Sequence, residues 1–191
     1  MNKRNYYLVN GITAYRIITY PLLVLLVFNK QMDWYKWLLA LSFFTDAIDG
    51  YLARKFKVAS IAGARLDSIG DDLTVIAGII GMIVFKQAFF KQQIFIFILL
   101  GSLFALQAVF AFIKYRKMTS FHTYAAKAAA VLQGIFLILL FFLPNPLYSL
   151  FYVSVIFTAL ELIEEIIIIF LLPQWKSDVK GLYWIMKKSS A

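Results

Sequence analysis

The sequence contains no cysteine, a single histidine and only ten acidic residues. Without cysteine there is no disulfide, no zinc site built on thiolates and no thiol catalysis. It also lacks any long polar stretch, because 62% of its 191 residues are hydrophobic and 18% are aromatic. Long apolar runs such as Ile94–Leu100 and Gly134–Leu143 are typical of segments that cross a lipid bilayer. The composition therefore predicts an integral membrane protein.

Six apolar segments are each long enough to cross the hydrocarbon layer as a helix. The connections between them are short, and the last is the turn Pro144-Asn145-Pro146, in which two prolines interrupt helical structure. The sequence thus predicts an all-α membrane protein with six transmembrane helices, forming a single domain over residues 1–191. The expected spans are residues 12–28, 34–52, 67–85, 92–113, 124–143 and 147–172.

Basic residues are distributed unevenly between the two predicted sides of the membrane. Four lie on one side, Lys30, Lys36, Lys86 and Lys91, and thirteen lie on the other. Because lysine and arginine accumulate in cytoplasmic loops, both termini are expected in the cytoplasm, with residues 174–191 as an amphipathic tail. No nucleic-acid partner is expected, since no basic face with interleaved aromatic residues extends outside the apolar segments. The thirteen are Lys3, Arg4, Arg54, Lys55, Lys57, Arg65, Lys114, Arg116, Lys117, Lys176, Lys180, Lys187 and Lys188.

Four aspartates, Asp46, Asp49, Asp67 and Asp71, lie within or at the ends of two apolar segments. An uncompensated carboxylate in the hydrocarbon costs at least about 3 kcal/mol, so four of them indicate a bound metal or a proton path. The spacings of three and four residues place each pair on one face of its helix. Counting about 1.5 Å per residue from Trp34 places Asp46 in the inner half of the bilayer. All four carboxylates are expected to share one pocket.

The residue types around the aspartates suit a site for a divalent cation and a phosphorylated ligand. Oxygen ligands without histidine or cysteine favour Mg²⁺, Mn²⁺ or Ca²⁺ over zinc, and two ions would neutralise the group. Gly50, Ala53 and Gly63 leave room for a bulky polar ligand, and Arg54 can pair with phosphate through its forked donors. The alternative, an ion-paired helix interface, needs four basic partners within the membrane that the sequence lacks.

These residues form the pattern Asp46-x2-Asp49-Gly50-x2-Ala53-Arg54-x8-Gly63-x3-Asp67-x3-Asp71. The pattern resembles the signature of the CDP-alcohol phosphotransferase (CDP-alcohol phosphatidyltransferase) family at all eight positions. The resemblance implies that a substituted phosphate passes from a CDP-linked lipid to an alcohol with release of CMP, usually in a homodimer and with two Mg²⁺ or Mn²⁺ ions. It further implies that Asp46, Asp49 and Asp67 are metal ligands, that Asp71 completes the metal site and is the general base, and that Gly50, Ala53, Arg54 and Gly63 line the cytidine diphosphate site.

The expected donor is CDP-diacylglycerol, because the chain is small and its plan is bacterial in appearance. The acceptor is a small polar alcohol, and glycerol 3-phosphate, inositol phosphate and serine all remain open. The protein is expected in the bacterial cytoplasmic membrane with its active site facing the cytoplasm. An ion or proton transporter is a weaker alternative, since it would distribute carboxylates along a path. An intramembrane prenyltransferase would need a second aspartate-rich motif far from Asp67-x3-Asp71.

A second motif, Asn10-x2-Thr13-x2-Arg16, resembles the start of the first helix in phosphatidylglycerophosphate synthases and their relatives. The three residues share a helical face, and the resemblance implies that they face the nucleotide. The alternative is that Asn10 caps the helix and the Arg16 side chain extends along it toward the interface.

Cationic residues near the fifth span are candidates for binding a phosphorylated acceptor, above all Arg116, His122 and Lys127. Lys127 lies in a stretch similar to Gly-Lys-x-Lys-Thr-x-x-Gln of glycerol-phosphate-using relatives, although Ala129 and Ala130 replace Lys-Thr. For Arg116 the alternative is a positively charged cytoplasmic loop, for His122 a headgroup contact, and for Lys127 a side chain that reaches the interface.

Three glutamates, Glu161, Glu164 and Glu165, interrupt the sixth span. Glu161 and Glu165 are four residues apart and share a helical face. Pairing with Arg16 or Lys127 across the bundle is expected, with acceptor binding as the alternative.

Overall fold

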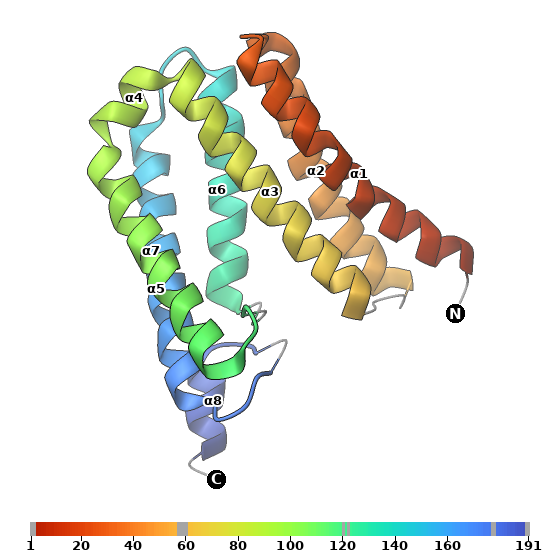
Figure 1. Ribbon diagram of the computed structural model, residues 1–191, viewed down its shortest axis with the longest axis vertical. Coiled ribbons are helices and arrows are strands. Elements are labelled where there is room, and N and C mark those ends of the chain that lie inside the picture. The colour runs from red at the N-terminus through yellow and green to blue at the C-terminus, as the bar shows by residue number, and fades with distance from the viewer. Residues whose placement is uncertain (1–2, 57–60, 120, 122, 177–178, 190–191) are drawn as a thin grey trace. The chain divides into compact units, whose positions relative to one another are not determined.

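The computed structural model describes residues 3–56, 61–119, 121, 123–176 and 179–189, and only their backbone at 3–10, 12–13, 47, 49–54, 61–65, 67–68 and 188–189. In this part of the chain all regular secondary structure is helical, which confirms the all-α prediction (Figure 1). The helices are α1 Lys3–Phe28, α2 Met32–Phe56, α3 Ile61–Phe85, α4 Gln87–Gln92, α5 Ile94–Tyr115, α6 Tyr124–Phe142, α7 Tyr148–Leu171 and α8 Leu182–Ser189.

The six long helices α1, α2, α3, α5, α6 and α7 follow the six predicted apolar segments. Two of them, α5 and α6, are long and apolar enough to be candidate membrane spans by length and composition, and Ala14–Phe28 of α1 is a shorter apolar helix. The expected connection over residues 53–66 is largely helical instead, since α2 continues to Phe56 and α3 begins at Ile61. Alanine, arginine and lysine favour a helix, so helical structure continues where the apolar segment ends.

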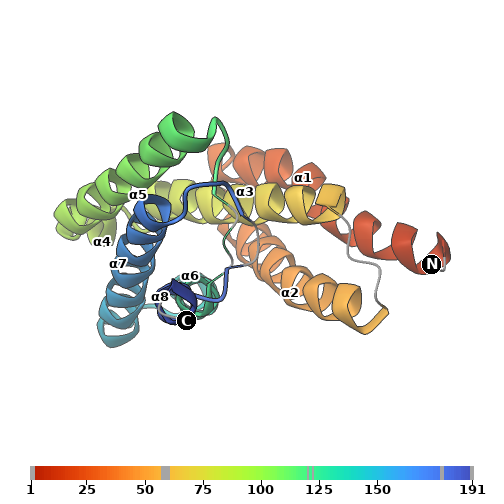
Figure 2. The ribbon, with the colours of Figure 1, turned by 90° about the horizontal axis from the view of Figure 1, so that it is seen from below.

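The chain divides into two compact units, and the first consists of residues 1–91 with 141–144. Within it α1 packs along both α2 and α3, and the three helices run side by side (Figures 1 and 2). Tyr35 of α2 joins α2 to α3. It is fully buried, and its hydroxyl donates a hydrogen bond of 2.7 Å to the Ala77 carbonyl of α3. The rings of Phe85 and Phe141 lie 5.3 and 5.1 Å from the Tyr35 ring.

The second unit, residues 92–140 and 145–191, is built on α5 and α7, which pack together. The buried residues Ala111, Phe121, Ile168, Ile169 and Val179 form its core cluster, and α8 contacts α7. The α6 helix is joined to α7 by polar contacts, since the Ser154 hydroxyl donates to the Leu132 carbonyl at 3.1 Å and the Gln133 amide donates to Thr158 Oγ1 at 2.6 Å.

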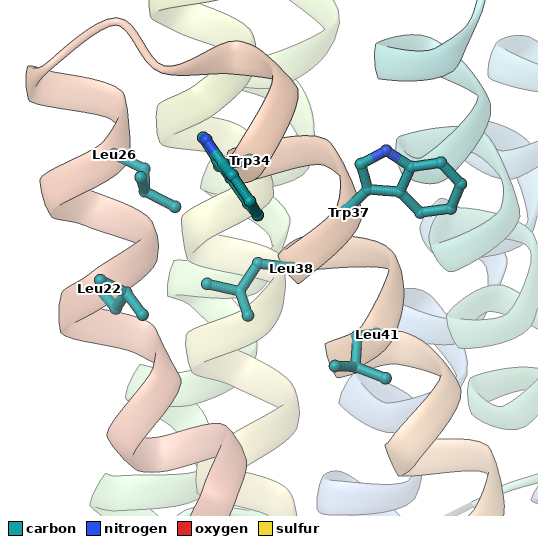
Figure 3. Close-up of a pocket in the computed structure, with 6 residues that line it drawn as sticks. All are labelled: Leu22, Leu26, Trp34, Trp37, Leu38 and Leu41. Carbon is teal, nitrogen blue, oxygen red and sulfur yellow. The ribbon is translucent and has the colours of Figure 1, made fainter.

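A groove on the first unit is lined by leucine and tryptophan side chains alone. Leu22 and Leu26 come from α1, and Trp34, Trp37, Leu38 and Leu41 come from α2 (Figure 3). Trp34 and Trp37 are 72% and 64% exposed, and many other large apolar side chains on the long helices are exposed too. Apolar surface of this extent is typical of a protein whose surroundings are lipid.

Candidate functional site

Arg16, Asp46 and Asp71 meet where α1, α2 and α3 pack together. Arg16 of α1 is only 1% exposed. Its Nη1 atom donates a hydrogen bond of 2.6 Å to Asp46 Oδ1 and another to Asp71 Oδ1, so one nitrogen joins carboxylates from two helices. The two aspartate side chains are 40% and 43% exposed. The result is a half-open pair of carboxylates with a buried cation beneath it.

Small and hydroxylated residues allow this charged group to form between helices. Gly70 of α3 is buried directly beside Arg16, and a Cβ atom at this position would lie 3.4 Å from Arg16 Cζ. Thr74, one turn further along α3, is also buried, and its hydroxyl donates to the Gly70 carbonyl at 2.8 Å. Because Thr74 satisfies its hydroxyl within its own helix, it adds no unpaired polar group beside the guanidinium.

The shared nitrogen places the two carboxylates close together. Each hydrogen bond has a donor–acceptor distance of at most about 3.2 Å, so Asp46 Oδ1 and Asp71 Oδ1 lie within about 6 Å of each other. Paired divalent ions lie about 3.5–4 Å apart in two-metal sites, so carboxylates at this separation fit ligands on either side of such a pair. Among the side chains that the structure describes, no group of three or more His, Cys, Asp or Glu residues gathers.

For most of the other predicted site residues the structure describes the backbone but not the side chain. Asp49, Gly50, Ala53 and Arg54 are on α2, Gly63 and Asp67 are on α3, and Asn10 and Thr13 are on α1. His122 lies outside the described residues altogether.

The position of Arg16 corrects one sequence-based alternative. Its side chain does not extend toward the membrane interface, since it is buried and joined to Asp46 and Asp71. An ion-paired interface would need four basic partners within the membrane, which the sequence was expected to lack, and Arg16 is a partner for two of the aspartates. The pattern could have indicated this pairing, because a lone cation within an apolar helix needs an anion at similar depth.

The candidate acceptor residues Arg116 and Lys127 belong to the second unit, and both are exposed. Arg116 ends α5 in the left-handed conformation with φ 55°, and its backbone N–H donates to the Phe112 carbonyl. Lys127 is on the first turn of α6, where its ammonium group lies 5.6 Å from the centre of the Tyr124 ring. The Tyr124 ring thus lies within range of a cation–π contact with the Lys127 ammonium group.

Two of the three glutamates of α7, Glu164 and Glu165, have polar partners that sequence reasoning missed. Glu165, 7% exposed, accepts hydrogen bonds from the Gln107 amide at 2.6 Å and the Thr119 hydroxyl at 3.0 Å, in place of the expected basic residue. Glu164 accepts a hydrogen bond of 2.8 Å from the Leu182 N–H at the start of α8. These contacts join α7 to α5, α8 and the segment that precedes α6, which is a structural role.

The family model described as CDP-alcohol phosphatidyltransferase matches residues 6–169. A curated relative from Haemophilus influenzae, named CDP-diacylglycerol–glycerol-3-phosphate 3-phosphatidyltransferase, is 33% identical over 82 residues, which are 41% of this chain and 44% of the relative. The matched region therefore spans less than half the length of that relative. No solved structure matches the chain significantly.

Proposed function

Because the chain belongs to the CDP-alcohol phosphatidyltransferase family, we propose that it transfers a phosphatidyl group from CDP-diacylglycerol to a small polar alcohol and releases CMP. The observation that carries the proposal is the approach of Asp46 and Asp71, the first and last aspartates of the family motif, from two different helices onto one nitrogen. Two half-exposed carboxylates at this point are open to a ligand from one side.

The proposed ligands of two Mg²⁺ or Mn²⁺ ions are the carboxylates of Asp46, Asp49, Asp67 and Asp71. When bound, such ions supply electrostatic stabilisation of the diphosphate and of the charge that develops on the departing CMP. The proposed role of Asp71 in the reaction is to accept the proton of the attacking hydroxyl. Gly50, Ala53, Arg54 and Gly63, with Asn10 and Thr13 from α1, are the proposed contacts of the nucleotide.

The acceptor binds, in this proposal, through cationic side chains. Arg116, His122 and Lys127 are the proposed contacts, and a phosphorylated alcohol suits them best. The Haemophilus influenzae relative is named for glycerol 3-phosphate, so this acceptor is the first to test. Inositol phosphate and serine are the other members of the acceptor panel.

The proposed setting is the bacterial cytoplasmic membrane, with six spans in a single domain, both termini in the cytoplasm and the aspartates near the cytoplasmic side. The two apolar helices α5 and α6 support membrane insertion, and the thirteen basic residues on one predicted side support the orientation. A homodimer is proposed on the family resemblance alone.

The proposal is tested by incubating the purified protein with labelled CDP-diacylglycerol, Mg²⁺ and each alcohol of the panel separately. The expected result is release of CMP together with one new phospholipid, formed with a single preferred alcohol. Absence of any new lipid with every alcohol, under conditions in which the protein remains folded, would reject phosphatidyl transfer.

A further inference from the structure

The guanidinium of Arg16 contacts two of the four carboxylates that the proposed function assigns to divalent cations. Its Nη1 donates to Oδ1 of both Asp46 and Asp71, and its side chain has no exposed surface. Arginine does not lose its proton in proteins, so this positive charge is present at every accessible pH. The positive charge of Arg16, unlike its contacts, is therefore constant over this pH range.

A guanidinium and a metal ion make competing demands on a carboxylate oxygen. A divalent cation binds the lone pairs of carboxylate oxygens, and for Mg²⁺ the distance from the ion to the oxygen is about 2.0–2.1 Å. A hydrogen bond from Nη1 uses lone pairs of the same oxygens, and two positive charges at neighbouring positions repel each other. A divalent cation that binds these two Oδ1 atoms must therefore displace Arg16 from them.

We propose that Arg16 is an internal counter-ion, which holds Asp46 and Asp71 together in the cation-free protein and leaves their oxygens when divalent cations bind. This inference rests on the proposed function, and it makes Arg16 a positioning residue that sets cation affinity. The buried position of Gly70 beside Arg16 Cζ gives the guanidinium a close-fitting wall on α3.

The direction of the effect on affinity follows from competition. If the state with Arg16 withdrawn has a population of about one tenth in the cation-free protein, the apparent affinity for the cation is lowered about tenfold. Removing the charge with Arg16→Gln releases both carboxylates, so the variant should bind cations about tenfold more tightly than the wild type. Arg16→Lys keeps the positive charge, and its affinity should remain near the wild-type value.

The test measures cation binding without substrate and without turnover. Purified protein in detergent is stripped with a chelator and titrated with Mn²⁺, and free Mn²⁺ is followed by electron paramagnetic resonance. Lys36→Gln is the matched control, because Lys36 is another ion-paired cation of the first unit, joined to Asp33 at 2.6 Å on the surface. Tighter binding by Arg16→Gln, with Lys36→Gln unchanged, is the expected result.

The remaining outcomes separate the two proposals. Wild-type binding of Mn²⁺ with equal or weaker binding by Arg16→Gln overturns the counter-ion role and leaves the proposed function standing. Absence of Mn²⁺ binding in both proteins rejects the metal site itself, and the counter-ion role with it.

A second measurement uses the wild-type protein and so does not depend on the folding of Arg16→Gln. The chain has five arginines, Arg4, Arg16, Arg54, Arg65 and Arg116, so ¹⁵N-arginine labelling gives few side-chain signals. The Arg16 signal is assigned by its absence in Arg16→Lys. It should change in chemical shift as Mg²⁺ is added, and an Arg16 signal that is unaffected at saturating Mg²⁺ contradicts the release.

Discussion

At the residue scale, the two most deeply buried charged side chains among those that the structure describes, Arg16 and Glu165, are held by different kinds of partner. Arg16 donates to the carboxylates of Asp46 and Asp71, and Glu165 accepts from the neutral side chains of Gln107 and Thr119. A buried charge without such partners is strongly unfavourable, so both arrangements stabilise the fold. Only the first leaves carboxylates half exposed, which is why it is the better candidate for chemistry.

Gln107→Leu should lower the stability of the second unit, because it removes a donor from the buried carboxylate of Glu165. The expected loss is about 1–3 kcal/mol of unfolding free energy, measured by thermal or chemical unfolding in detergent. Gln133→Leu is the control, since Gln133 donates at 2.6 Å to a neutral hydroxyl, that of Thr158. If Gln133→Leu destabilises the protein as much as Gln107→Leu, the buried charge is not what makes Gln107 important.

Lys127→Ala should selectively weaken the binding of phosphorylated acceptors. Loss of one charge-assisted contact predicts a rise in KM of about tenfold or more for glycerol 3-phosphate, with little change for serine. Lys117→Ala is the matched control, because the Lys117 ammonium group also lies over an aromatic ring, 5.3 Å from the centre of Trp175. An equal loss with every acceptor would remove the proposed role of Lys127.

At the scale of elements, the close approach of α2 and α3 depends on a missing side chain. A Cβ atom at Gly81 would overlap the hydroxyl and ring of Tyr35, whose hydrogen bond to Ala77 joins the two helices. Asp46 and Asp71 are carried by the same pair of helices. The packing around Tyr35 therefore helps to fix the distance between these carboxylates.

Gly81→Ala should destabilise the first unit by about 1–3 kcal/mol, since Tyr35 must move to admit the methyl group. Gly101→Ala makes the same change on α5, where no atom lies within 4 Å of the added Cβ. There the better helix propensity of alanine should leave stability unchanged or raise it by up to about 1 kcal/mol. Thermal unfolding of both variants checks the contrast, and a Gly81→Ala protein as stable as Gly101→Ala would refute the packing argument.

The sequence could predict the helices but not which of their faces pack together. Hydropathy located the six long helices that the structure describes, and two of them, α5 and α6, are long and apolar enough to be candidate membrane spans. On α1, however, Leu23 and Val27 are buried while Leu22 and Leu25 are exposed. Lipid and protein interior are equally apolar, so the pattern of hydrophobic residues does not distinguish the two faces.

The candidate site was likewise predictable only in part. The spacing of the aspartates placed each pair on one helical face, because that depends on helix geometry alone. The pairing of Arg16 with Asp46 and Asp71, and that of Gln107 with Glu165, joins residues 30 to 58 positions apart in the chain. The depth of Arg16 in its helix indicates that it needs an anionic partner, but which carboxylates it contacts, and which side chain contacts Glu165, depends on how the helices pack.

At the scale of the whole molecule, the apolar surface and the uneven basic charge together determine the proposed orientation. Trp34 and Trp37 are exposed near the start of α2, as aromatic anchors at a membrane interface would be. The thirteen basic residues are expected on the cytoplasmic side. The chain naturally contains no cysteine, so single cysteines can report this orientation without background labelling.

Lys91→Cys should react with a membrane-impermeant thiol reagent on intact cells, whereas Lys117→Cys should react only after the cells are made permeable. The difference is expected because the proposed six-span topology puts residue 91 outside and residue 117 in the cytoplasm. Labelling is measured by mass shift of the purified protein. The reverse pattern would contradict the proposed orientation, and labelling of both in intact cells would contradict the topology.

The most direct test of the account is the cation dependence of CMP release from CDP-diacylglycerol by the wild type, Asp71→Asn and Asp72→Asn. Asp72 is the exposed neighbour of Asp71 on α3 and lies outside the aspartate motif, so it controls for the loss of one charge. The wild type and Asp72→Asn should release CMP only when Mg²⁺ or Mn²⁺ is present, and Asp71→Asn should be slower by at least about 100-fold. Full release in excess chelator, or an undiminished rate in Asp71→Asn, would contradict the account.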